Sequence, residues 1–137
     1  RFNYTISAES LLYSFDYIPD KILINGVEID YTGYMVYDLE KEENNITMIF
    51  YDLLPTCQAM FSNLKNMISI DLSKFDSSHV TETACMFNGC ESLISINFGT
   101  FNTESVTDMH KMFFRCIYQN FLFLVHHLLL ASLCNYN

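Results

Sequence analysis

Apolar and polar residues alternate with two different spacings in the middle of the chain, and the whole pattern recurs. The pair Met60-Phe61 returns as Met86-Phe87 and as Met112-Phe113, at a constant interval of 26 residues. A fixed period of this size is typical of repeat proteins, in which each unit buries its apolar face by stacking on the next. The pattern therefore predicts a stack of similar coils.

The first half of each unit has the apolar spacing of a helix. Residues at i, i+3, i+4 and i+7 are apolar in the first unit, where they are Cys57, Met60, Phe61 and Leu64. Such positions share one face of a helix. The predicted second and third helices open with a threonine followed by an acid, at Thr81 and Thr107, which suits the start of a helix. We predict one helix in each unit.

The second half of each unit has a spacing of two, which is typical of a strand. Apolar residues at 68, 70 and 72 alternate with Ser69 and Asp71, and those at 94, 96 and 98 alternate with Ser95 and Asn97. A polar return follows each strand. We expect the strands of successive units to pair in parallel, with the helices on the opposite side.

Before the repeats, residues 4–52 show strand signals and no helical period. Residues 21–24 and 27–30 flank Asn25-Gly26, a dipeptide that favours the type I′ turn of a hairpin. Residues 34–39 and 46–51 form a second predicted pair, joined by an acidic run that we interpret as a solvated loop. We expect these strands to form a small antiparallel sheet that covers the first coil.

The repeated motif resembles the BspA-like leucine-rich repeats of microbial surface proteins. The resemblance is clearest at residues 71–80 and 86–93 and extends over residues 56–116. The chain departs from that pattern at Leu64, where the family prefers cysteine, and at Gly99, where it prefers serine. The resemblance implies an α+β fold, namely a short leucine-rich-repeat solenoid with an antiparallel β N-terminal cap.

The predicted organisation has three parts. Residues 1–55 form the β cap, and residues 56–116 form the repeat region. The repeat region consists of two full units, 56–81 and 82–107, and a partial unit, 108–116. Residues 117–137 form an apolar tail with no Asp, Glu, Lys or Arg. Three interpretations of the tail stay open: a membrane-spanning helix, which its length disfavours, a terminal helix over the last coil, or the product of a shifted reading frame.

The composition of the chain disfavours several classes of function. The 137 residues carry a formal charge of −9, with 16 acids against 7 Lys and Arg, so we expect neither nucleic acid nor an anionic membrane as a partner. Hydrophobic residues make up 50% of the chain, which disfavours global disorder. The chain begins with Arg1 and shows no signal sequence, so we expect either that a signal peptide has been removed or that the chain is a fragment of a longer protein. The abrupt end of the repeats favours a fragment.

No residue pattern indicates catalysis, a cofactor or a metal. Five cysteines, at 57, 85, 90, 116 and 134, include no Cys-x-x-Cys pair and are expected to be free. Four histidines, at 79, 110, 126 and 127, lack ligand spacing. We therefore predict that the protein is not an enzyme and needs no cofactor, with a hydrolase as a distant alternative for which no residue can be nominated.

The predicted binding face consists of the small polar side chains that alternate out of the repeated strands, Ser69, Asp71, Ser95 and Asn97. An equally weighted alternative is that they only keep the outer face soluble. Asn3 and Asn45 fit the N-glycosylation pattern. The resemblance implies a secreted or surface protein that binds or adheres to a protein or cell-surface ligand. The alternative is an intracellular scaffold for protein interactions.

Overall fold

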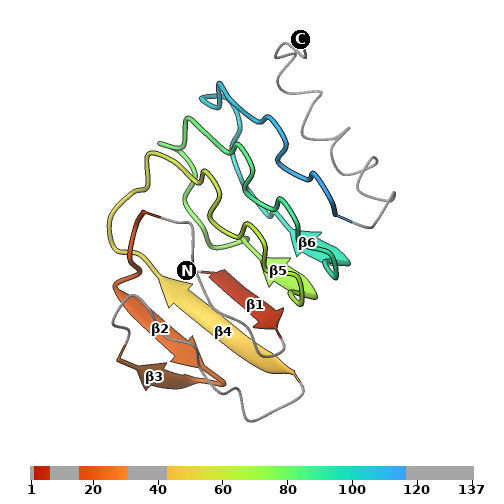
Figure 1. The fold of residues 1–137 in the computed structure, drawn as a ribbon. Coiled ribbons are helices and arrows are strands. Elements are labelled where there is room, and N and C mark those ends of the chain that lie inside the picture. The colour runs from red at the N-terminus through yellow and green to blue at the C-terminus, as the bar shows by residue number, and fades with distance from the viewer. Residues whose placement is uncertain (1, 7–15, 31–42, 117–137) are drawn as a thin grey trace.

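The computed structural model describes residues 2–6, 16–30 and 43–116. These residues form six strands, β1 (Phe2–Ile6), β2 (Lys21–Ile24), β3 (Val27–Ile29), β4 (Asn44–Ile49), β5 (Ser69–Asp71) and β6 (Ser95–Asn97). All six belong to one sheet, in the order β3-β2-β4-β1-β5-β6 (Figure 1). The described part of the chain contains no helix and is all-β.

The predicted α+β leucine-rich-repeat solenoid is therefore wrong, because each predicted helix is a series of turns. Left-handed residues interrupt these segments at intervals of four, which an α-helix does not allow. They are Ala59, Asn63, Cys85, Gly89, Lys111 and Arg115, with φ between 54° and 75°. The apolar spacing had correctly identified which side chains face inward, but turns of this kind produce the same spacing without helical hydrogen bonds.

Backbone hydrogen bonds instead join each coil to the next. The N–H groups of Cys57, Ala59, Phe61 and Asn63 donate to the carbonyls of Glu82, Ala84, Met86 and Asn88, at 2.7 to 2.9 Å. The equivalent groups of the second coil donate in the same way to the third. The alternate N–H groups close turns within one coil, as Met60 does on the carbonyl of Cys57. Stacking therefore satisfies backbone groups that a helix would satisfy internally.

Repeated side chains lie over one another in the interior. The rings of Phe61 and Phe87 are stacked with centroids 5.6 Å apart, and those of Phe87 and Phe113 with centroids 5.4 Å apart. The methionine of each pair is buried as well, at 1%, 0% and 6% exposure for Met60, Met86 and Met112. The prediction that the three Met-Phe pairs face a common interior is confirmed.

The threonines predicted to begin helices stack the coils instead. Thr107 donates both its backbone N–H and its hydroxyl to the carbonyl of Thr81, at 2.8 and 3.2 Å. Thr81 donates in the same way to the carbonyl of Pro55, at 2.9 and 3.1 Å. A threonine-acid pair thus marks a coil junction here, which explains why a capping pattern recurs without a helix.

The N-terminal strands continue the sheet of the coils. The predicted hairpin is confirmed, since β2 pairs antiparallel with β3 around Asn25 and Gly26, whose φ angles are 51° and 85°. Strand β1, which sequence patterns did not predict, pairs antiparallel with both β4 and β5. It therefore lies along the first repeated strand (Figure 1). The predicted strand at 34–39 and the tail at 117–137 lie outside the described residues.

Candidate functional site

The structure brings the four predicted binding residues together. Strands β5 and β6 pair in parallel, with Ser69 opposite Ser95 and Asp71 opposite Asn97. The side chains of Ser95 and Asn97 are exposed, and those of Ser69 and Asp71 are half-buried. The alternate positions, Ile70 and Ile96, are buried in the core. We name these four polar residues the polar strip.

Two residues of the polar strip also shape the backbone that follows. Asp71 Oδ1 accepts the N–H of Ser73 at 2.8 Å, and Asn97 Oδ1 accepts the N–H of Gly99 at 3.1 Å. Hydrogen bonds from Ser73, first from its side chain and then from its backbone, hold the pKa of Asp71 below its usual 3.8. These turns end both strands. An Asp or Asn two residues before a small residue is a turn signal that sequence reasoning overlooked here.

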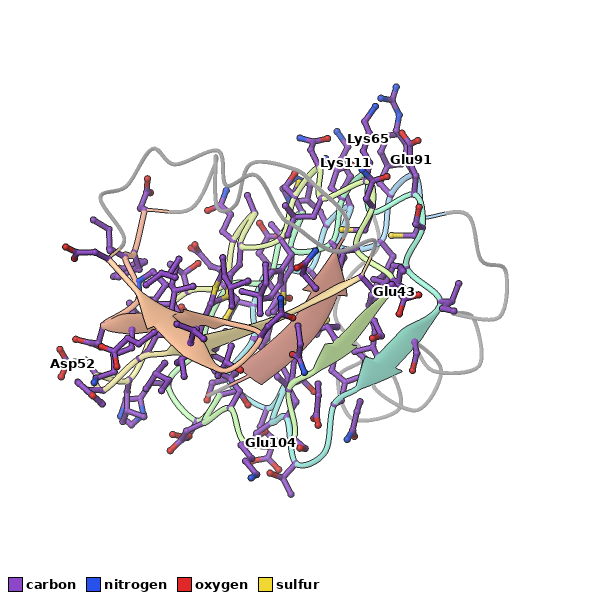
Figure 2. All side chains as sticks on the ribbon, turned by 90° about the horizontal axis from the view of Figure 1, so that it is seen from below. Glu43, Asp52, Lys65, Glu91, Glu104 and Lys111 are labelled. Carbon is purple, nitrogen blue, oxygen red and sulfur yellow. The ribbon has the colours of Figure 1, made fainter. Side chains whose placement is uncertain are left out.

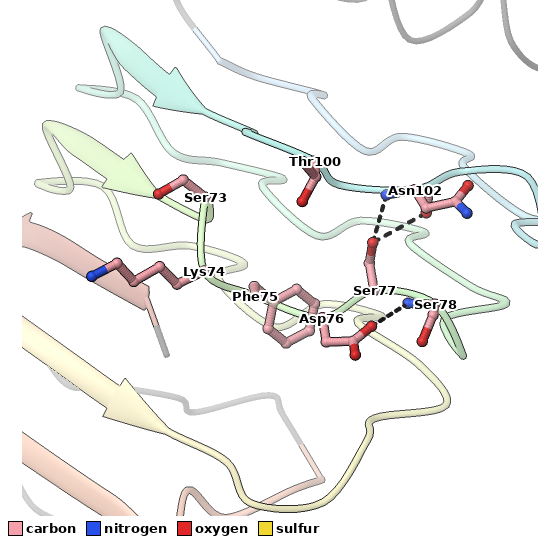
Figure 3. A pocket seen from close by; sticks show the side chains of 8 residues that line it. All are labelled: Ser73, Lys74, Phe75, Asp76, Ser77, Ser78, Thr100 and Asn102. Carbon is pink, nitrogen blue, oxygen red and sulfur yellow. Dashed lines mark hydrogen bonds between the residues drawn. The ribbon is translucent and has the colours of Figure 1, made fainter.

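A shallow groove begins where the polar strip ends (Figure 3). Its volume is about 390 Å³, and it lies between the return segments of two successive coils. The lining residues are Ser73, Lys74, Phe75, Asp76, Ser77, Ser78, Thr100 and Asn102. We name this the return groove. Sequence reasoning treated these residues only as a connection, although their 26-residue alignment indicates that two copies lie side by side.

Hydrogen bonds fix the walls of the return groove. Ser77 is 3% exposed, and its Oγ accepts the N–H of Asn102 at 2.6 Å and donates to the Asn102 carbonyl at 3.3 Å. Asp76 Oδ1 accepts the N–H of Ser78 at 3.0 Å (Figure 3). The side-chain and then the backbone hydrogen bond from Ser78 lower the pKa of Asp76 below its usual 3.8. The groove therefore offers an ionised carboxylate on a rigid wall.

The return groove presents side chains of both charges. Lys74 and Asp76 are exposed and of opposite charge, so the groove offers both donors and acceptors. Ser78 Oγ lies 3.0 Å from Nδ1 of His79, but both residues are exposed neighbours. A serine nucleophile needs an oriented base in a water-excluded site, which this solvent-facing pair does not provide.

The described cysteines are free, and two of them bridge coils. Cys90 Sγ donates to the carbonyl of Phe61 at 3.0 Å, and Cys116 Sγ donates to the carbonyl of Phe87 at 3.1 Å. Burial raises the pKa of Cys57 to about 12. Burial also raises the pKa of Cys116. The raised pKa values keep the thiols of Cys57 and Cys116 protonated at neutral pH. Cys134 lies outside the described residues.

The described ranges contain neither a metal-binding cluster nor a candidate membrane span. No group of three or more His, Cys, Asp or Glu side chains there is arranged to hold a metal ion. His110 is exposed, and its Nδ1 contacts Asp108 Oδ1 at 2.9 Å, while His126 and His127 lie outside those ranges. The same ranges hold no helix of membrane-spanning length and apolarity.

The two glycosylation candidates lie in neighbouring strands. Asn45 was expected in a loop but lies in β4, where its side chain is exposed. Asn3 lies in β1, where its backbone is paired between Thr47 and Asp71. Register thus places both acceptor patterns in the middle of the sheet.

Comparison with known proteins corrects the family assignment. A family model described as "Mycoplasma protein of unknown function, DUF285" matches residues 34–121. The assignment to BspA-like leucine-rich repeats is wrong, because this is the family whose model matches. Searches of curated proteins and of solved structures found no significant match. Since residues 34–121 are more than half of the 137-residue chain, the protein belongs to the DUF285 family.

Proposed function

We propose that this protein is a non-catalytic binding protein that holds a protein or other cell-surface ligand on the polar strip and the return groove. The observation that supports this proposal is the register of β5 and β6. It aligns Ser69 with Ser95 and Asp71 with Asn97 on the face opposite the buried isoleucines. The stack thereby presents a row of hydrogen-bonding groups that the core does not use.

The return groove extends this row onto a rigid support. Phe75, which lines the groove, is 6% exposed and stacks on Phe101 with centroids 5.9 Å apart. Ser77 holds the neighbouring coil at Asn102. Groups held in place before binding lose less conformational entropy when a ligand arrives. A polar ligand that crosses two coils would therefore meet preformed partners on both.

Arginine substitutions on the exposed surface test this function. Ser95→Arg and Thr100→Arg place a long charged side chain on the strip and in the lining of the groove, whereas Ser105→Arg changes another exposed serine that belongs to neither. The native chain would be assayed against immobilised extracellular glycoproteins and oligosaccharides. We expect a bound panel member whose affinity falls about tenfold, or about 1.4 kcal/mol, in the first two variants.

The matched variant decides the outcome. Ser105→Arg should retain affinity within about twofold, because it leaves the strip and the groove unchanged. An equal loss in all three variants, or no binding to any panel member, would count against the proposal. Circular dichroism would first show that every variant is folded.

The location of the protein is a further part of the proposal. We propose a secreted or surface location, which the exposed side chain of Asn45 in its acceptor pattern supports. The alternative is an intracellular scaffold, and the free thiols of Cys57, Cys85, Cys90 and Cys116 favour it, because thiols persist in reducing compartments. Cell fractionation of the full-length product, with mass analysis of Asn45, separates the two.

A further inference from the structure

Exposed apolar side chains gather where the N-terminal strands meet the first coil. The described residues expose seven large hydrophobic side chains, and four of these lie in the two short segments 17–18 and 51–53. They are Tyr17, Ile18, Tyr51 and Leu53, with exposures of 37%, 67%, 68% and 47%. Single exposed apolar residues are ordinary, but a cluster indicates an interaction site.

The two segments leave the sheet side by side. Lys21 of β2 pairs with Ile49 of β4, and just beyond this pair Asp20 Oδ2 accepts the N–H of Tyr51 at 2.7 Å. Each segment is held by a buried residue, Pro19 in one and Leu54 after the other. The exposed side chains therefore project from anchored backbone.

Acidic side chains alternate with the apolar ones in these two segments. Asp16, Asp20 and Asp52 are all exposed. The one base in these segments and their immediate neighbours, Lys21, is paired with Glu28 at 2.9 Å. Figure 2 shows Asp52 at one end of the molecule, far from Lys65 and Lys111. Within these segments the acidic side chains outnumber the bases, so the local charge is negative.

We infer that these residues form a docking surface for a protein segment that combines apolar side chains with lysine or arginine. The surface, which we name the junction patch, consists of Asp16, Tyr17, Ile18, Asp20, Tyr51, Asp52 and Leu53. Apolar anchors would supply buried area, and basic side chains would complement the aspartates. A second copy of this chain would bring like charges together, and an anionic membrane would be repelled. The junction patch shares no residue with the polar strip or the return groove, so the inference is independent of the proposed function.

Binding of a defined peptide to the full chain tests the inference. The probe is a short fluorescent peptide in which lysine and leucine alternate, followed by anisotropy. Peptides that alternate lysine with serine, or glutamate with leucine, each lack one of the two required properties. We expect the lysine-leucine peptide to bind at least about tenfold more tightly than either, because both apolar and charge contacts are needed.

Paired substitutions show whether binding occurs at the patch. Ile18→Ser and Tyr51→Ser should each weaken binding about tenfold, and Asp52→Asn should weaken it about threefold and reduce its salt dependence. Val27→Ser and Glu104→Gln are matched controls, since Val27 is also 67% exposed and Glu104 is an exposed acid elsewhere. The controls should change affinity by less than about twofold.

Several outcomes would overturn the inference. These are failure of the lysine-leucine peptide to bind, equal binding of either comparison peptide, and equal weakening by the control variants. Light scattering provides a further test. A dimer that Tyr51→Ser abolishes would assign the patch to a second copy of the chain and overturn the inference. Thermal melts of each variant would exclude loss of folding as the cause.

Discussion

Strand residues meet different kinds of partner in the two halves of the sheet. In the coils, each strand residue lies beside its own counterpart one period later, as Ile70 lies beside Ile96. In the N-terminal half, unlike residues meet, as Leu23 meets Thr47 across β2 and β4. A repeat therefore needs one side chain that packs well against a copy of itself, whereas the antiparallel half needs individually matched partners.

Strand β1 connects these two regions. It pairs with β4 on one side and with β5 on the other, both antiparallel. Coupling through shared backbone hydrogen bonds should make the two regions unfold together.

Removing a stacked ring should have the largest effect. Phe87 is 0% exposed and lies between Phe61 and Phe113, with Phe98 at its edge. We expect Phe87→Ala to lower the free energy of unfolding by about 3–5 kcal/mol. Urea unfolding followed by circular dichroism would measure the loss. Ile46→Ala is the counterpart in β4, with an expected loss of about 2–5 kcal/mol. Two separate transitions in either variant would show that β1 does not couple the regions.

Substitution of two glycines separates the cost of close packing between coils from the cost of a left-handed backbone alone. Gly99 has a φ of +54°, and a Cβ added there would lie 2.5 Å from Cα of Ser73. Gly26 has a φ of +85° in the hairpin, with no atom near an added Cβ. We expect Gly99→Ala to cost about 2–4 kcal/mol, since backbone strain and overpacking add, and Gly26→Ala to cost about 1–2 kcal/mol. Equal shifts of the melting temperature would contradict close stacking at Gly99.

A buried hydroxyl should matter more than an exposed one in the same return. Ser77 is 3% exposed and accepts the N–H of Asn102. Ser77→Ala leaves that N–H without its partner, and we expect a loss of about 1–3 kcal/mol. Ser78→Ala, on the exposed neighbour, should change stability by less than about 0.5 kcal/mol. Denaturant titration compares the two, and a larger effect at Ser78 would be inconsistent with this hydrogen-bond network.

The smallest effect concerns pH. Because the pKa of Asp71 is lowered in the folded state, its contribution to stability is present above pH 3.8 and is lost as the pH falls through the folded-state pKa. Asn97 makes the same turn without a charge. We therefore expect Asp71→Asn to retain the fold and to unfold less steeply in acid. An NMR titration that gives Asp71 a pKa at or above 3.8 would refute the assigned cause.

Sequence patterns predicted the inward residues better than the backbone conformation. The 26-residue period correctly placed Met60, Phe61 and their equivalents in one core. The helix prediction failed because side-chain spacing does not specify where N–H groups donate. In this chain they donate to the next coil, a long-range partner that no local window contains.

The candidate site was predicted in part. The polar strip followed from alternation, since Ser69 and Ser95 could be identified as outward positions of two copies of one strand. The return groove required the second coil to lie against the first, which brings Thr100 and Asn102 beside Ser77. The junction patch was missed because its apolar and acidic members lie in two segments more than 30 positions apart, joined by the hydrogen bond from the N–H of Tyr51 to Asp20.

The sequence alone determined the period, the inward side chains and the turn at Asn25-Gly26, because these depend on residue type and local spacing. Only the tertiary structure decided that the coils are turns rather than helices and that β1 lies between β4 and β5. Those features depend on hydrogen bonds between residues distant in sequence, and backbone donors are chemically alike in every residue except proline. Their partners are chosen by packing of the whole chain.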